Sequence, residues 1–243
     1  MNDVNTHVGS AINGLMNEYN IIANNLANVS TIGYKRRCNT FSKILNEHNA
    51  KTGVNADGEA KLHSVFDFSQ GNIIETGRTF DLAICGKGFF VIETPQGPLY
   101  TRNGTFNVNA NGQLVDSAGR AVAGVDGPIT IPSEIAVSEI HISNDGSISA
   151  RGTNIGKIRI VDFGENVNQL TPAGLNCFAA PKTVQPVNID NPLIKQGYLE
   201  GSNVQMMEEL VDMIMVSRLY EANMKFMTVG SDNTKSLMSV AMG

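Results

Sequence analysis

Residues 4–28 read VNTHVGSAINGLMNEYNIIANNLAN and contain no proline. The apolar residues recur in steps of four or three, which places them on one stripe of an α-helix. The stripe consists of Val4, Val8, Ile12, Leu15, Tyr19, Ile22 and Leu26. Because this spacing also resembles a short heptad seam, the segment is predicted to be an amphipathic helix that packs against another helix.

The opposite face of this predicted helix carries amides instead of charges. These amides are Asn13, Asn17, Asn20, Asn24 and Asn28. Amide side chains form hydrogen bonds without the repulsion that like charges would add between neighbouring chains. Two interpretations stay open: a helix that covers the domain of its own chain, or a helix that pairs with helices of other chains.

The C-terminal segment, from residue 203 to about residue 237, is also predicted to be helical. It holds no proline, and Glu208 and Glu209 suit its early turns. At 100° per residue its apolar side chains form two stripes. The first stripe holds Val204, Val211, Met215, Leu219, Ala222, Phe226 and Val229, and the second holds Met206, Met213, Val216, Tyr220, Met224 and Met227. Two stripes require two sets of neighbours, namely the N-terminal helix and another subunit.

Methionine usage supports the second set of neighbours. All ten methionines except Met1 and Met16 lie at or after Met206. An unbranched thioether adapts to irregular surfaces, which suits a helix that packs against non-identical partners. A methionine-rich core helix of a monomer is the alternative explanation.

Residues 72–181 have the texture of an all-β domain, with short strands separated by glycine and asparagine turns. Hairpins are predicted around Asn111-Gly112 and Asp145-Gly146. We therefore predict an α+β fold in which the terminal helices pair as a coiled-coil-like layer and a central all-β domain is inserted between them. The predicted parts are the N-terminal helix (1–33), an extended connector with a helical turn near 41–45 (34–71), the β domain (72–195) and the C-terminal helix (196–243).

Composition excludes several classes of function. A net charge of -5 argues against nucleic-acid binding, and no apolar run approaches the roughly 20 residues that span a bilayer. The first basic residue is Lys35, so no secretory signal is predicted. Cys38, Cys85 and Cys177 stand too far apart in sequence for a disulfide framework or a metal motif. We predict no cofactor, no metal and no small-molecule substrate.

The sequence also lacks a recognisable catalytic constellation. Gly86-Lys87-Gly88 precedes a strand-like run, so it does not present a helix N-terminus to a phosphate. Asp116, Asp126 and Asp145 lie near glycines and are interpreted as turn residues. A secreted cell-wall hydrolase that uses a carboxylate pair of the β domain is a remote alternative, and a monomeric binding module with helical ends is another.

Residues 24–36 (NNLANVSTIGYKR) resemble the N-terminal signature of bacterial flagellar rod and hook proteins. Residues 70–77 (QGNIIETG), 79–92 (TFDLAICGKGFFVI) and 100–106 (YTRNGTF) resemble the β domain of that family, and 196–204 (QGYLEGSNV) and 216–227 (VSRLYEANMKFM) resemble its C-terminal helix. Residues 127–132 (GPITIP) and 144–152 (NDGSISARG) are most similar to proximal rod proteins, whereas 219–223 (LYEAN) is closer to distal rod and hook proteins.

The resemblance implies a structural protein and not an enzyme. Such a subunit leaves the cytoplasm unfolded through the flagellar type III export apparatus, without a cleaved signal peptide, and folds in the periplasm. There it polymerises with copies of itself and with neighbouring proximal and distal rod proteins into a helical drive shaft, which carries torque from the motor to the hook. It binds no nucleic acid and does not insert into the membrane. A distal rod or hook protein is the nearest alternative.

The residues expected at the subunit interface follow from the stripes and from the amide-rich end of the first helix. In the first helix they are Val8, Ile12, Leu15, Tyr19, Ile22, Leu26, Asn24, Asn25 and Asn28. In the last they are Val204, Val211, Met213, Met215, Val216, Leu219, Tyr220, Met224, Phe226 and Met227. Gly33 and Tyr34 are expected to form the turn or hinge, with Gly33 in a backbone conformation that is costly for other residues.

Overall fold

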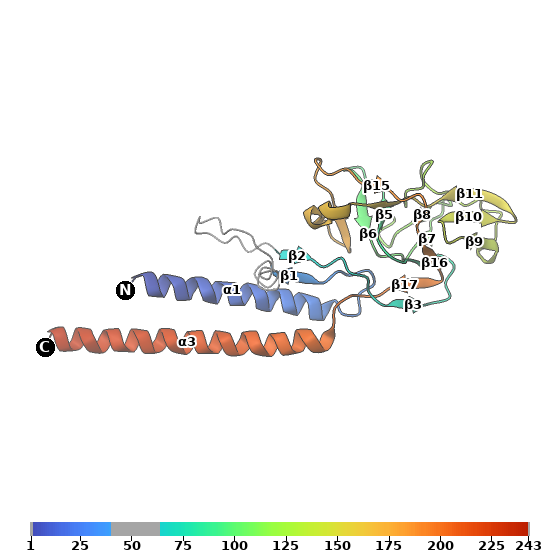
Figure 1. Ribbon diagram of the computed structural model, residues 1–243. Helices are drawn as coiled ribbons and strands as arrows, with labels where there is room; N and C mark the ends of the chain where they lie inside the picture. The colour runs from blue at the N-terminus through green and yellow to red at the C-terminus, as the bar shows by residue number, and fades with distance from the viewer. Residues whose placement is uncertain (1, 40–63, 243) are drawn as a thin grey trace. The chain divides into compact units, whose positions relative to one another are not determined.

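The computed structural model describes residues 2–39 and 64–242 and has an α+β fold in which most elements are strands (Figure 1). The predicted helical turn at residues 41–45 lies outside the described residues. The chain divides into two compact units. The first, called the helical unit here, comprises Met1–Ala27, Arg37–Phe66 and Gln205–Gly243, and the second, called the β unit, comprises Asn28–Arg36 and Asp67–Val204.

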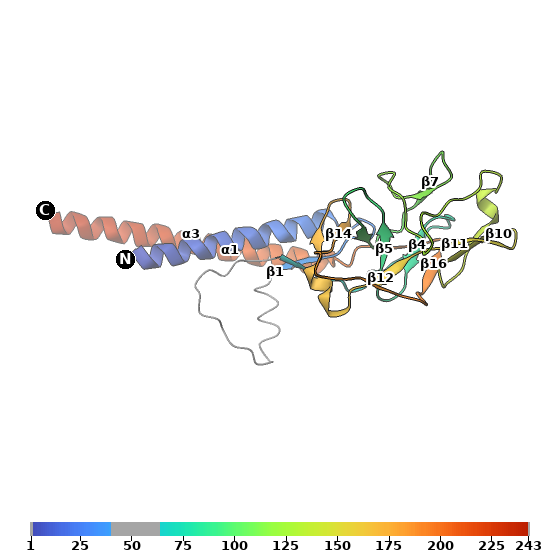
Figure 2. The ribbon, with the colours of Figure 1, turned by 90° about the horizontal axis from the view of Figure 1, so that it is seen from above.

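Two helices and one small strand pair make up the described part of the helical unit. Helix α1 spans Asn2–Ala27 and helix α3 spans Met206–Met242. The two helices contact each other and run in opposite directions, as Figures 1 and 2 show. Strand β1 (Arg37–Asn39) pairs antiparallel with β2 (Ser64–Phe66) and contacts α1.

Helix α3 begins later than the sequence pattern predicts, which corrects the placement of Val204 on a helical stripe. The Asn203 side chain accepts a hydrogen bond from the backbone N–H of Arg36 (2.7 Å) and donates one to the carbonyl of Asp67 (2.9 Å). The Val204 N–H donates to Ser202 Oγ (3.2 Å), and the Val204 side chain is buried. These bonds engage residues 202–204 in the β unit, so the helix starts at Met206.

The β unit is built from short antiparallel strands. Its largest sheet has six strands in the order β13-β14-β6-β5-β12-β15. These strands are β5 (Phe89–Ile92), β6 (Leu99–Thr101), β12 (Ile160–Asp162), β13 (Thr171–Pro172), β14 (Cys177–Ala179) and β15 (Val187–Asn188). Two strand pairs join β3 (Ile73–Glu75) to β17 (Tyr198–Glu200) and β4 (Leu82–Ile84) to β16 (Ile194–Gln196).

Both predicted hairpins are confirmed. Strands β7 (Asn107–Val108) and β8 (Leu114–Val115) pair around a turn in which Gly112 has a φ of 77°. Strands β9 (Ile140–Ile142) and β10 (Ser147–Ala150) pair around Gly146, with a φ of 86°, and β11 (Thr153–Lys157) extends that sheet. Glycine adopts these left-handed conformations without a Cβ clash, so the local turn chemistry fixed both hairpins.

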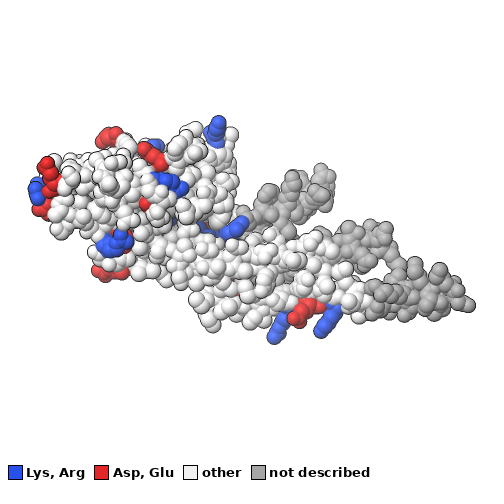
Figure 3. Space-filling model, turned by 180° about the vertical axis from the view of Figure 1, so that it is seen from behind, with Lys and Arg blue, Asp and Glu red and all other residues white. Residues whose placement is uncertain are grey.

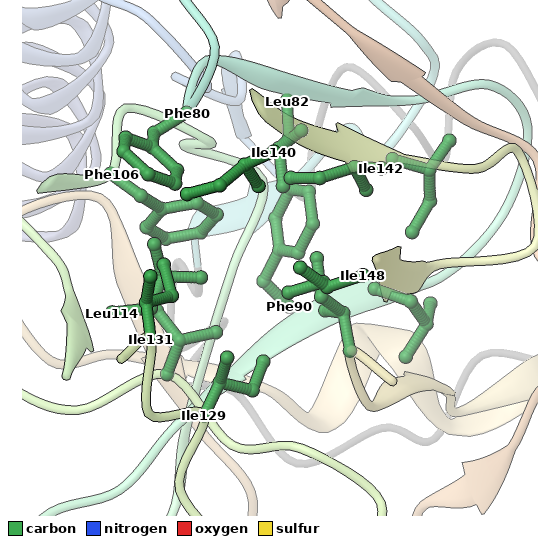
Figure 4. Packing of buried hydrophobic residues seen from close by; sticks show 14 of the residues in the cluster. Phe80, Leu82, Phe90, Phe106, Leu114, Ile129, Ile131, Ile140, Ile142 and Ile148 are labelled. Carbon is green, nitrogen blue, oxygen red and sulfur yellow. The ribbon is translucent and has the colours of Figure 1, made fainter. Parts of the chain in front are cut away.

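The β unit encloses a close-packed apolar core. Phe80, Leu82, Phe90, Phe106 and Ile148 belong to one buried cluster, part of which is shown in Figure 4. The rings of Phe90 and Phe106 meet edge to face, with centroids 5.1 Å apart. Burial of each such side chain contributes about 1.5–3 kcal/mol, so this core accounts for much of the stability of the β unit.

Candidate functional site

Apart from Val204, the first predicted stripe lies on α3 and on the surface of the single chain. Val211 is 56% exposed, Met215 57% and Phe226 62%. The exposed apolar side chains of this stripe on α3, called the open face here, are Val211, Met215, Leu219, Ala222, Phe226 and Val229. Monomeric proteins rarely leave such a continuous apolar strip in water, and such strips mark interaction sites.

The second predicted stripe of α3 is largely covered. Met213, Val216, Tyr220 and Met227 are half-buried, whereas Met206 and Met224 stay exposed. Between α1 and α3 lies a groove of about 430 Å³. It is lined by Leu15, Met16, Tyr19 and Asn20 of α1 and by Val216, Ser217, Tyr220 and Glu221 of α3. The two stripes therefore differ in surroundings, because α1 covers one of them and leaves the other open.

Charge is sparse around these helices. On the side seen in Figure 3, most of the surface of the described helices is uncharged. Arg218, Glu221 and Lys225 are exposed on α3 and lie outside both stripes. The open face can therefore lose water without the burial of a charged group, which would cost several kcal/mol.

The predicted residues of α1 have different surroundings. Ile22 and Asn25 are buried, Tyr19 and Asn24 are exposed, and Ile12, Leu15, Leu26 and Asn28 are half-buried. Val8 lies in α1, but its side chain is outside the described part of the structure. The exposed Asn24 donates to the carbonyl of Asn20 (2.7 Å), one turn earlier in the same helix. These amides thus do not share one environment.

Asn25 forms its hydrogen bonds inside the helical unit. Its side-chain oxygen accepts the N–H of Arg37 (2.9 Å), and its Nδ2 donates to the carbonyl of Arg37 (2.9 Å) and to Glu209 Oε2 (3.2 Å). Glu209 is buried, although the sequence suggested only a favourable position near the start of a helix. The amide of Asn25 therefore connects α1 to β1 and to the first turn of α3.

Gly33 and Tyr34 lie in a tight turn of the β unit. Gly33 has a φ of 68°, the left-handed conformation expected for this turn, and its N–H donates to the carbonyl of Glu200 (2.7 Å). A Cβ at Gly33 would collide with the backbone nitrogen of Asn103. Tyr34 is buried, and its N–H donates to the carbonyl of Thr31 (3.3 Å). Only glycine fits this turn without strain.

Beside this turn lies a buried ionic cluster that sequence reasoning missed. Glu200 receives Lys35 Nζ on Oε1 (2.6 Å) and Arg102 Nη1 on Oε2 (3.2 Å), and the N–H of Gly71 also donates to Oε1 (2.9 Å). Burial lowers the pKa of both Lys35 and Arg102, against the opposing attraction of Glu200. A charge placed in a short apolar strand, as in Tyr198–Glu200, was the available signal.

Two of the aspartates that the sequence placed in turns form turn hydrogen bonds. Asp116 accepts the N–H groups of Ala118 and Arg120 (both 2.9 Å), and Asp145 accepts that of Ser147 (3.2 Å), so the prediction of turn roles for both is confirmed. Within residues 2–39 and 64–242, no group of three or more His, Cys, Asp or Glu side chains is arranged to hold a metal ion. In the same ranges no helix has the length and apolarity to cross a membrane.

Comparison with known proteins gives matches along most of the chain. Residues 6–35 match the family model of flagella basal body rod proteins, 83–150 that of the D1 domain of the flagellar hook protein FlgE/F/G, and 195–240 that of the C-terminal region of flagellar basal body rod FlgEFG proteins. Flagellar basal-body rod protein FlgG of Agrobacterium fabrum is 35% identical over 90% of this chain and 91% of that protein. The chain belongs to the flagellar basal-body rod protein family.

The relatives include rod proteins named FlgF and rod proteins named FlgG. FlgF of Caulobacter vibrioides is 32% identical over 94% of this chain and 91% of its own length, and FlgG of Bacillus subtilis is 31% identical over 95% and 97%. This rod-family chain is therefore a structural subunit of the flagellar basal body and assembles with other rod subunits. The resemblance drawn from the sequence motifs is confirmed.

Proposed function

We propose that this chain is a subunit of the proximal rod, which polymerises helically into the shaft that carries torque from the motor to the hook. The single observation that carries the proposal is the open face of α3, with Val211, Met215 and Phe226 more than half exposed. An apolar strip that repeats on every copy favours head-to-tail contacts, and such contacts generate a helical filament when the rotation does not close.

The energetics favour assembly at the tip of a growing rod. Removing apolar surface from water contributes about 25 cal/mol per Å². Ordering a helix costs conformational entropy, which neighbouring subunits repay when they cover the open face. We infer that the terminal helices, within 1–33 and 196–243, form the paired, coiled-coil-like axial layer, and that the central β domain (72–195) packs outside it.

We propose that the subunit reaches the growing rod by flagellar export. The subunit passes unfolded through the flagellar type III export apparatus without a cleaved signal peptide, folds in the periplasm and contacts proximal and distal rod neighbours. Its role is mechanical and not enzymatic. Gly33 and Tyr34 form the hinge-like turn that follows the first helix.

The assignment of this subunit to the proximal end of the rod rests on short sequence motifs. The stretches GPITIP at 127–132 and NDGSISARG at 144–152 favour the proximal rod, whereas LYEAN at 219–223 favours the distal rod or the hook. A density map of isolated basal bodies in which this chain is traced tests the assignment. Density for the chain next to the hook, and none near the motor, would replace the proximal assignment with the distal one.

Carboxylates placed on the two stripes of α3 test the assembly proposal. Val211→Asp lies on the open face and Met213→Asp on the stripe that faces α1, so both place a charge where assembly or helix pairing requires apolar contact. We expect each variant to lose rod assembly while near-ultraviolet circular dichroism shows a folded β unit. Thr228→Asp, at an exposed position outside both stripes, is the matched control and should assemble. Normal rods from both stripe variants would refute the proposal.

A further inference from the structure

The connections between the two units have a feature that assembly alone does not explain. The chain passes from one unit to the other after residues 27, 36, 66 and 204. Force that the covalent chain transmits between the units must run through these connections. Residues at the β-unit ends of three of them, namely Arg36, Asp67 and Asn203, are bonded to one another.

These three residues form a closed triangle of hydrogen bonds. The N–H of Arg36 donates to Asn203 Oδ1 (2.7 Å), and the N–H of Asp67 donates to the carbonyl of Arg36 (2.8 Å). Asn203 Nδ2 donates in turn to the carbonyl of Asp67 (2.9 Å). Each connection is therefore held by both of the others, and none can be displaced without breaking two bonds.

The buried ionic cluster anchors the triangle to the body of the β unit. Lys35, which precedes Arg36, donates to Glu200 and also to the carbonyl of Ser69 (2.7 Å). The carbonyl of Glu200 accepts the N–H of Gly33, and Arg102 extends from Glu200 to the carbonyl of Gly86 (2.7 Å). The side chains of Lys35 and Glu200 are fully buried.

Buried ion pairs contribute little net stability compared with apolar packing, so stability alone does not account for this cluster. The directional bonds of buried ion pairs instead determine which segments meet and in what geometry. The loss of one partner is costly, because the other is left charged and out of water. A joint that must hold several strands in one arrangement under load has these requirements.

We propose that Lys35, Arg102, Glu200 and Asn203 form a clasp that carries mechanical load between the helical unit and the β unit, with Glu200 as its central positioning residue. This inference rests on the proposed rod function. The clasp residues lie in the β unit, and none of them belongs to the open face of α3. Subunits with a weakened clasp therefore still assemble, and they fail only when torque is applied.

The first measurement is hydrogen exchange of the full-length Glu200→Gln protein. The Gly71 amide donates to the Glu200 carboxylate and the Gly33 amide to the Glu200 backbone carbonyl. Exchange of both amides should accelerate by about a hundredfold, because the loss of a buried charge loosens the segment that holds both acceptors. Exchange of the Phe90 and Ile148 amides in the core should stay within about twofold. Glu139→Gln is the matched control, since it removes an exposed ion pair with Arg151 in the same unit and should change none of these rates.

The second measurement is swimming speed at increasing viscosity, in cells whose isolated basal bodies contain normal numbers of rods. Glu200→Gln should swim normally in dilute medium and lose at least about half of its relative speed at high viscosity. Asn203→Ala, which opens the triangle without leaving a buried charge, should show the same trend and provides the test if Glu200→Gln fails to fold.

Three results would overturn the clasp: unchanged exchange at Gly33 and Gly71, equal acceleration throughout the core, or a speed deficit that does not grow with viscosity. The proposed function fails separately, since it fails if the wild-type chain is absent from rods. Wild-type chain in rods together with variants that match it at every viscosity would reject the clasp and leave the proposed function standing.

Discussion

The helical unit and the β unit satisfy their apolar residues in different ways. In the β unit, Phe90 and Leu82 are fully buried within the same chain. In the helical unit, Phe226 and Val211 are more than half exposed, because α1 covers only one side of α3. The β unit buries its apolar residues within one chain, whereas the helical unit has an exposed apolar face, which we propose a neighbouring subunit covers.

The same contrast appears in polar groups. The β unit buries an ionic cluster around Glu200, in which both carboxylate oxygens have partners. The open face of α3 contains no charge that neighbours would have to neutralise. The buried charges of the β unit are thus paired within the chain, and the open face of the helical unit is apolar.

Truncation of one aromatic side chain in each unit, buried in one case and exposed in the other, tests this difference. Phe90→Ala removes a fully buried ring and should destabilise the β unit by about 3–5 kcal/mol. Phe226→Ala removes a ring that is 62% exposed and should change stability by less than about 0.5 kcal/mol in the unassembled chain. Urea denaturation of the two full-length variants measures both effects, and equal losses would contradict the contrast.

Gly33 and Gly77 together separate the cost of a left-handed backbone from the cost of a close backbone contact. Gly33 and Gly77 have nearly the same φ, 68° and 71°, but a Cβ at Gly33 meets the backbone of Asn103 while a Cβ at Gly77 meets open space. Gly77→Ala should cost about 1–2 kcal/mol from the left-handed conformation alone. Gly33→Ala should cost more than that and reduce motility. Thermal unfolding of both variants decides this, and similar midpoints would show that the close approach of Asn103 is relieved without cost.

Adjacent amides test the internal bonding of the helical unit. Asn25→Ala leaves the backbone of Arg37 and the buried Glu209 without their bonds to the amide and should cost about 1–3 kcal/mol. Asn24→Ala, at an exposed position in the same turn of α1, should be within about 0.5 kcal/mol of the wild type. Helical circular dichroism during heating compares them. The opposite order of stabilities would mean that Asn25 acts mainly between subunits.

Thiol reactivity gives the smallest expected difference between the units. Burial raises the pKa of the Cys177 thiol in β14, against the opposing effect of Arg120, so less thiolate is present at any given pH. Cys38 in β1 is only half-buried. Alkylation with iodoacetamide at pH 8 should therefore label Cys177 about tenfold more slowly than Cys38, and the difference should narrow as pH rises. Mass spectrometry of the labelled peptides measures both rates, and faster labelling of Cys177 would contradict this.

Local features of the fold were predictable from the sequence. The steps of four and three in residues 4–28 predicted α1, and Asn111-Gly112 and Asp145-Gly146 predicted two hairpins, because periodicity and turn chemistry act within a few residues. The two stripes of α3 were visible for the same reason. Their different exposure follows from the position of α1, which no local pattern encodes.

The features that sequence reasoning missed depend on partners far along the chain. Glu200 meets Lys35 across 165 positions and Arg102 across 98, and no spacing rule relates such residues. The start of α3 was placed too early, at residue 203, because Asn203 bonds to Arg36 and Asp67 in the β unit. Asn24 and Asn25 are adjacent in sequence, yet 100° of helical rotation leaves the Asn24 side chain exposed and places that of Asn25 against β1.

Hydrogen exchange of the full chain before and after assembly tests the claim that neighbouring subunits complete the helical unit. If the helical unit is completed only by neighbours, amides of α3 between residues 206 and 229 exchange at least about tenfold faster than those of β5 in the free subunit, and they slow to comparable rates in isolated rods. Amides of α3 that are already as protected as β5 in the free subunit, with no change on assembly, would contradict the claim.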